Sequence, residues 1–267
     1  DEVPEVHKEL VVKRESVSRT LLVAFFVSLV CSTLVASAAV VLKPRQVANA
    51  RLDVRRNILE VAGLMVPEAD VNETFAAIEP RIVDLESGAF VDGVDPEEFD
   101  PNRAARDPEI GVAIPENLDV ARIGRRAKHA LVYLVRDGDR VTRIILRVSG
   151  FGLWSTMYGL LALEPDGNSV ADIVFYAHAE TAGIGDFITN DAWRAGWRGK
   201  KAYDEEGALR LEVVKGRAPA GDPLADYHVD GVSGATLTGN GVTHLLRYWL
   251  GDHGYGPFLR SIRGEGS

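Results

Sequence analysis

Residues 130–148, ALVYLVRDGDRVTRIILRV, decide the fold class of this chain. Two runs rich in β-branched residues, 130–135 and 141–148, flank the sequence Asp137-Gly138-Asp139. A short turn of this composition between two such runs is typical of a β-hairpin. The stretch therefore predicts an antiparallel sheet.

The flanking sequence adds further elements to this hairpin. Strands are predicted at 159–163, 170–176 and 209–214, and helices at 47–62, 190–196 and 237–250. In the last of these helices Val242, Leu245, Leu246 and Trp249 share one face. The Pro- and Asp-rich stretch 91–108 is typical of a long loop or insertion. The pattern predicts an α+β chain, in which one domain combines an antiparallel sheet with peripheral helices.

Residues 21–42, LLVAFFVSLVCSTLVASAAVVL, carry no charge. As a helix this run measures roughly 33 Å, about the thickness of a hydrocarbon core. A secretory signal peptide with a cleavage site at Ala36-Ser37-Ala38 is the alternative. The length of the run and the charged stretch before it favour a retained transmembrane helix. Basic residues are similarly frequent on both sides, so charge does not predict the orientation.

Composition excludes several function classes. The net charge of −9 argues against a nucleic-acid partner, because neutralising phosphates requires clustered Lys and Arg. Cys31 is the single cysteine, so the chain alone can form no disulfide and no cysteine-ligated zinc or iron–sulfur site. The histidines form no pair with metal-ligand spacing, and no metal site is predicted.

Several nucleotide-binding and catalytic motifs are absent from the sequence. Gly150-Phe151-Gly152 lacks the third glycine of a dinucleotide fingerprint, and no phosphate-binding loop of the GxxxxGK type occurs. Ser155 does not lie in a GxSxG motif. We therefore predict no NADH site and no catalytic residue of this chain's own.

The most informative motif is DGVSGATLTGNGV at residues 230–242. It is a turn rich in hydroxyl and small residues that leads into the predicted C-terminal helix. Ser233 or Thr236 could cap that helix, and its N-terminus favours an anion. Gly234 and Ala235 would let a bulky group approach the backbone. From these residues alone, both a phosphate-binding helix start and a plain helix cap remain open.

The sequence from Asp230 through Ser233-Gly234-Ala235-Thr236 resembles the flavinylation motif of FMN-binding domains. In that family a dedicated transferase moves FMN from FAD onto the final threonine, forming a phosphodiester bond. The resemblance implies that Thr236 carries covalent FMN. It also implies that Ser233, Gly234, Ala235 and Thr238 lie beside it.

Two further segments, GFGLWSTMYG at 150–159 and YAHAETAGIG at 176–185, extend the resemblance. Together with SGATLTGNGV they resemble the C subunit of the sodium-pumping NADH:quinone oxidoreductase, whereas SGAT alone also suits the G subunit of the Rnf complex. Ala182 and Gly239 depart from the family pattern, which has Pro and Ser there. The additional cofactor contacts that this implies are Gly152, Leu153, Trp154, Ser155, Glu180 and Thr181. For Trp154 a place in the hydrophobic core is an equal alternative.

The resemblance implies an electron-relay subunit of a membrane oxidoreductase, in which other subunits oxidise NADH, reduce ubiquinone and move sodium. It implies maturation by a flavin transferase, an anchor in the bacterial inner membrane, a cytoplasmic N-terminus and an FMN domain on the periplasmic face. The expected division of the chain is a tail at 1–20, a transmembrane helix at 21–42, a juxtamembrane helix and loop-rich part at 43–129 and the covalent FMN-binding domain at 130–267. A membrane-tethered flavin sensor and a flavin-free structural anchor are the alternatives from other classes.

Overall fold

The computed structural model describes residues 17–66 and 70–265. The chain divides into two compact units, Asp1–Leu52 and Asp53–Ser267. Most of the predicted N-terminal tail, including Lys13 and Arg14, lies outside the described residues. The two units are considered separately.

Helix α1 (Val17–Val61) supplies the described part of the first unit. Among the described residues it is the one helix long and apolar enough to cross a membrane, judged by length and composition. The sequence predicted two helices, at 21–42 and 47–62, whereas the structure has one that includes Pro44. Proline removes one backbone hydrogen bond and disturbs the helix locally, but here the helical backbone continues beyond it.

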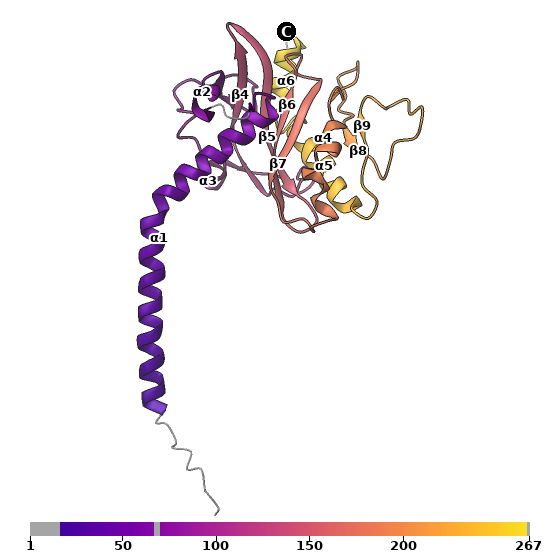
Figure 1. Cartoon of the computed structure of the whole chain (residues 1–267). Coiled ribbons are helices and arrows are strands. Elements are labelled where there is room, and N and C mark those ends of the chain that lie inside the picture. Colours follow the sequence, from indigo (N-terminus) through magenta and orange to yellow (C-terminus); the bar gives the residue numbers. More distant parts are fainter. Residues whose placement is uncertain (1–16, 67–69, 266–267) are drawn as a thin grey trace, which may run out of the picture. The chain divides into compact units, whose positions relative to one another are not determined.

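The second unit is built on a five-stranded antiparallel sheet, which confirms the predicted fold class (Figure 1). Its strand order is β1-β4-β5-β6-β7. The bounds are β1 Ile78–Asp84, β4 His129–Asp137, β5 Arg140–Phe151, β6 Thr156–Leu163 and β7 Val170–Ala177. Strands β4 and β5 form the predicted hairpin, which turns at Gly138 with a φ of 59°. Since β1 pairs with β4, the sheet begins well before residue 130.

Each face of the sheet carries its own hydrophobic core. On one face Leu146 and Val148 pack with Leu245 and Leu246 of helix α5 (Thr236–Trp249). On the other face Ile145 packs with the end of α1, where Ile58, Leu59 and Val61 are buried. Adjacent β5 residues contribute to opposite cores because side chains alternate along a strand. The sheet is thus covered on both sides, and α5 is held firmly against it.

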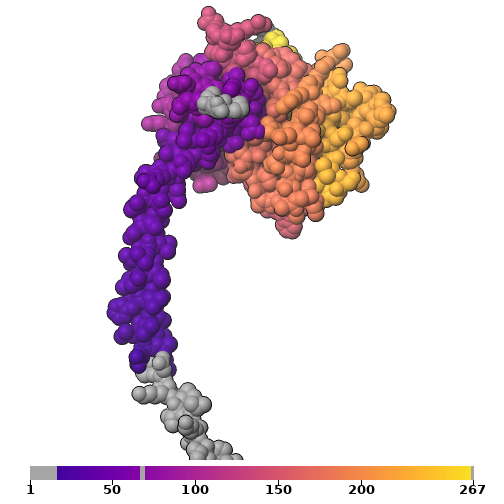
Figure 2. Space-filling view, viewed as in Figure 1, coloured from indigo at the N-terminus to yellow at the C-terminus, as the bar shows by residue number. Residues whose placement is uncertain are grey.

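Shorter elements complete the unit. They are α2 Val71–Phe75, α3 Pro101–Arg106, β2 Gly111–Ala113, β3 Arg125–Ala127, the 3₁₀ helix η1 Gly185–Thr189, α4 Asp191–Ala195, β8 Glu212–Val213, β9 His228–Val229 and α6 Gly256–Arg263. The predicted loop at 91–108 contains α3, whose first turn is capped by the Asp100 side chain. The strand predicted at 209–214 shortens to β8, which pairs in parallel with β9. In the space-filling view the later part of the chain, coloured orange to yellow, gathers on one side of this unit (Figure 2).

Candidate functional site

Three segments meet around the buried side chain of Glu180. Its Oε1 accepts hydrogen bonds from the backbone N–H groups of Leu153 at 3.0 Å and Trp154 at 3.2 Å. Its Oε2 accepts one from the hydroxyl of Thr238 at 2.6 Å. Glu180 is only 7% exposed, so these bonds replace the water that a carboxylate requires. One carboxylate thereby joins the β5–β6 loop, the loop after β7 and the first turn of α5.

Two glycines make this close approach possible. A Cβ atom on Gly152 would lie 2.4 Å from Glu180 Oε1. A Cβ atom on Gly185 would lie 3.0 Å from the Cβ of Glu180 and 3.1 Å from the Thr238 hydroxyl. Larger residues at either position would displace the carboxylate from its donors.

A second set of bonds joins the two loops near the surface. The indole N–H of Trp154 donates to the Thr181 hydroxyl at 3.0 Å. The Ser155 hydroxyl accepts a hydrogen bond from the Ala179 N–H at 2.9 Å. Trp154 is 65% exposed, which contradicts the alternative that it belongs to the hydrophobic core. Its ring is fixed at one edge and open to solvent elsewhere.

Helix α5 begins differently from the prediction that Ser233 or Thr236 caps it. The capping position is occupied by Ala235, and no side chain forms a cap hydrogen bond there. Gly234, with a φ of +88°, makes the turn before it. Thr236 is the first helical residue and is half-buried, whereas Ser233 is exposed. The free N–H groups and the positive end of the helix dipole therefore lie beside the Thr236 backbone.

Thr238 is placed more firmly than the sequence suggested. It is 1% exposed, and its hydroxyl proton is directed to Glu180 rather than to solvent. A contact between this hydroxyl and a cofactor remains a prediction. Through its bond to Glu180, Thr238 fixes the first turn of α5 against the loop after β7.

Two exposed apolar residues of these segments are not among the predicted site residues. Ile184 is 51% exposed and Leu237 is 60% exposed, beside the already identified Leu153 and Trp154. Large apolar side chains left in water are a common mark of a binding surface when several come from adjacent segments. An isoleucine and a leucine next to glycine- and hydroxyl-rich motifs are the signal that could have identified them.

The site contains hydroxyls, one carboxylate and backbone N–H groups, and its chemistry is that of holding an anion and an apolar ring. Across residues 17–66 and 70–265, no group of three or more His, Cys, Asp or Glu side chains is placed to hold a metal ion. Predicted residues Gly152, Leu153, Trp154, Ser155, Glu180, Thr181 and Thr238 are brought together by the bonds described above. Ser233, Gly234, Ala235 and Thr236 form the turn and helix start that directly precede Thr238.

Comparison with known proteins gives a consistent result. The FMN-binding domain family matches residues 152–251, a range that includes all three segments. The C subunit of the Na(+)-translocating NADH-quinone reductase of Yersinia pestis is 47% identical over 254 residues, covering 93% of this chain and 94% of the relative. The same subunit of Pseudomonas aeruginosa is 46% identical over 254 residues, covering 94% and 97%.

Solved structures agree with these relatives. The crystal structure of Shewanella oneidensis NqrC has a TM-score of 0.74 and 34% identity, covering 81% of this chain and 99% of that one. The C subunit of the Parabacteroides distasonis reductase has a TM-score of 0.63 and 26% identity, covering 82% and 96%. With such identity to the curated relatives over nearly its whole length, the chain belongs to the NqrC family, the C subunits of Na(+)-translocating NADH-quinone reductases.

Proposed function

We propose that this chain relays electrons within a Na(+)-translocating NADH-quinone reductase through FMN joined to Thr236 by a phosphodiester bond. The observation that carries the proposal is the start of α5, where the Thr236 hydroxyl stands at a helix end that no side chain caps. Membership of the NqrC family and the match to the FMN-binding domain support the same cofactor.

The residues at this helix end fit a phosphate group. A helix N-terminus offers unpaired N–H donors and a positive dipole, both of which favour a phosphodiester anion. Gly234, in the left-handed region, leaves room beside the backbone because it carries no side chain. A Cβ atom added there would meet no atom within 4 Å. The turn is therefore open on the side from which a bulky group would approach.

The environments of three hydroxyls favour Thr236 as the attachment point. Thr238 is buried and donates to Glu180, so it is shielded from a transferase. Ser233 is exposed but precedes the helix, whereas Thr236 is its first residue. An ester at Thr236 would thus place its phosphate beside the free N–H groups.

The exposed apolar residues suit the flavin ring. Leu153, Trp154 and Leu237 present apolar surface from the β5–β6 loop and from α5. We propose that these side chains contact the ring, while Glu180 and Thr181 hold the loops in position. FMN supplies the electron-transfer chemistry, and the protein supplies orientation and a local environment.

Attachment requires activation that an isolated threonine hydroxyl lacks. In the proposed reaction Thr236 Oγ1 attacks the FMN-side phosphorus of FAD. A new P–O bond forms, the pyrophosphate P–O bond breaks and the AMP half leaves. A separate flavin transferase would hold the substrate and accept the hydroxyl proton.

The proposed setting is the bacterial inner membrane, with α1 as a single span, the N-terminus in the cytoplasm and the FMN domain on the periplasmic side. NADH oxidation and quinone reduction belong to other subunits of the complex in this proposal. The NqrC relatives favour this assignment over an Rnf-type relay.

The test is intact-mass measurement of wild type and Thr236→Ala, both purified from a host with an active flavin transferase. We expect wild type to carry an FMN-sized adduct that survives denaturation and fluoresces on a gel, and the variant to lack it. Absence of the adduct from wild type would support a flavin-free anchor instead. An adduct in a protein that copurifies with no reductase subunits would support a flavin sensor.

A further inference from the structure

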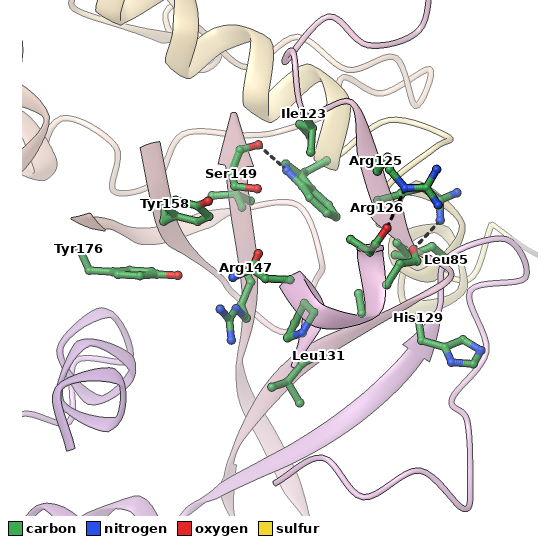
Figure 3. Close-up of a pocket in the computed structure, with 17 residues that line it drawn as sticks. Leu85, Ile123, Arg125, Arg126, His129, Leu131, Arg147, Ser149, Tyr158 and Tyr176 are labelled. Carbon is green, nitrogen blue, oxygen red and sulfur yellow. Dashed lines mark hydrogen bonds between the residues drawn. The ribbon is translucent and has the colours of Figure 1, made fainter. Parts of the chain in front are cut away.

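Strands β4 and β5 separate toward one end of the sheet. Their pairing ends at Val132 and Leu146. Beyond this point β4 continues beside β1, as far as His129 opposite Asp84, and β5 continues beside β6. A cavity of about 70 Å³ lies in this fork, between residues 129–131 on one side and 147–149 on the other (Figure 3). It has room for more than one water molecule.

Two backbone carbonyls of β5 that no longer pair with β4 accept hydrogen bonds from side chains instead. The carbonyl of Arg147 accepts a hydrogen bond from the Tyr255 hydroxyl at 2.9 Å. The carbonyl of Ser149 accepts one from the indole N–H of Trp249 at 2.7 Å, the dashed line at Ser149 in Figure 3. These side chains replace the strand that has moved away, so the cavity does not result from fraying.

The cavity wall is basic, whereas the whole chain is acidic. The chain has 39 acidic and 30 basic residues, yet the wall includes Arg125, Arg126, Arg147 and His129 and no carboxylate. His129 contacts Asp84 at 3.7 Å, which partly offsets its charge when protonated. A smaller adjoining cavity shares Arg147 and Tyr176 and also lacks a carboxylate.

Arg147 is the cation that lines both cavities. The guanidinium groups of Arg125 and Arg126 donate to backbone carbonyls. The strongest electrostatic neighbours of Arg147 are the tyrosines Tyr176, Tyr133 and Tyr255. Burial raises the pKa of Tyr133, although Arg147 opposes this, so its phenol stays protonated at neutral pH. Among the described residues that line the two cavities with Arg147, none is a carboxylate.

The groups beside Arg147 are phenols and an amide, which can donate as well as accept hydrogen bonds, and the Tyr133 hydroxyl already interacts with the guanidinium. Tyr158 and Tyr176 extend their rings toward it in Figure 3, with ring centroids 6.4 Å apart. Asn57, near the end of α1, adds an amide to the smaller cavity. A guanidinium has a fork of N–H donors that matches two oxygens of one anion, and phenols add further O–H donors. This set is complementary to an oxyanion.

We propose that the β4–β5 fork binds a phosphate group, with Arg147 as the principal ligand and Tyr176 as a second donor. The group can come from free inorganic phosphate or from a phosphodiester headgroup of a lipid. The site shares no residue with the cluster around Glu180, so it is separate from the proposed flavin attachment.

The test follows thermal unfolding of the full chain in detergent while phosphate replaces chloride at constant ionic strength. Ligands that bind the folded state raise its stability in a saturable way. We expect a saturable rise for wild type and for Arg140→Gln. Arg147→Gln should need roughly tenfold more phosphate, because the charge-assisted bonds are lost. Arg140 is a matched control, since it is exposed and lies at the opposite end of the same strand.

Two further measurements separate ligand binding from a structural role. Without phosphate, Arg147→Gln should unfold no earlier than wild type, because it removes a half-buried charge that faces no carboxylate in either cavity wall. Tyr176→Phe keeps that charge and should weaken phosphate binding without preventing folding. Early unfolding of Arg147→Gln together with unchanged binding by Tyr176→Phe would contradict the proposal.

Glycerophosphoglycerol, a soluble phosphodiester, distinguishes the two sources. Tighter binding of this diester than of inorganic phosphate would indicate a lipid headgroup, and the reverse order would indicate the free ion. The proposal is wrong if neither compound stabilises wild type beyond chloride, or if Arg147→Gln responds to both as wild type does.

Discussion

The hydroxyl of Thr238 donates a 2.6 Å hydrogen bond to Glu180 across 58 residues of sequence. The same carboxylate holds the N–H groups of Leu153 and Trp154 through its other oxygen. Glu180 therefore couples the position of α5 to that of the β5–β6 loop, and its removal should affect both.

For Glu180→Ala we expect a loss of about 1–3 kcal/mol in the free energy of unfolding, because three donors, of which the Thr238 hydroxyl is fully buried, lose their acceptor. The measurement is urea unfolding of the full chain in detergent. Glu205→Ala removes an exposed carboxylate and should change stability by less than about 0.5 kcal/mol. Equal effects of the two variants would show that the Glu180 bonds contribute nothing.

Gly152→Ala tests the fit between the loop and this carboxylate. Its Cβ would lie 2.4 Å from Glu180 Oε1, so we expect destabilisation by about 1–3 kcal/mol from overpacking. The double variant with Glu180→Ala should lose much less than the sum of the two single effects, because the clash disappears with the carboxylate. Strict additivity in this cycle would contradict the described contact.

The hydroxyl of Ser233 provides a test of the attachment point. Ser233→Ala should retain the covalent flavin, because Ser233 precedes the helix. Thr236→Ser preserves a hydroxyl at the first helical residue and should retain at least part of the adduct. Intact mass of the denatured proteins measures both. If Ser233→Ala loses the adduct and the Thr236 variants keep it, the attachment point is Ser233 and not Thr236.

Stability should fall in alkali partly through Tyr203. Its hydroxyl donates to the Leu250 carbonyl at 2.6 Å, and burial raises its pKa to about 12, although Arg263 opposes the shift. The unfolded chain therefore loses this proton first, and stability decreases as the pH rises from about 10 to about 12.

The measurement is the slope of unfolding free energy against pH. In Tyr203→Phe the slope above about pH 10 should be shallower, while stability at neutral pH falls by about 1 kcal/mol through the lost hydrogen bond. Tyr227→Phe is the control, because its hydroxyl forms no hydrogen bond with other described residues. An unchanged slope in Tyr203→Phe would contradict the assignment.

The sequence predicted the central strands well because alternation and β-branched residues dominate them. It did not predict β1, where Pro80 interrupts the pattern and Glu79 and Arg81 surround it. Proline is tolerated there because β1 is the edge strand of the sheet, and only its end, at residues 82–84, is also bridged on the outer side by residues 89–91. The pattern also did not show that α1 continues through Pro44.

The candidate site residues were predicted from the resemblance to a known family. The contacts of each side chain could be assigned only from the fold. Thr236 and Thr238 are two residues apart, and composition does not show which hydroxyl is buried. Only the packing of α5 against the sheet directs Thr238 to Glu180 and leaves Thr236 half-buried. Trp154 is similar, because a tryptophan in a loop can face the core or the solvent until neighbours such as Thr181 fix it.

The bond between Glu180 and Thr238 also has a consequence for biosynthesis. All five strands of the sheet leave the ribosome before α5, because they precede it in the chain. The β5–β6 loop can therefore reach its final contacts only after α5 has been translated, and domains generally fold as units. The proposed flavin acceptor site is therefore complete only in a chain translated through α5. If FMN is attached at Thr236 as proposed, chains that end before α5 would offer a transferase no assembled site, so the order of translation would delay attachment until α5 has been made.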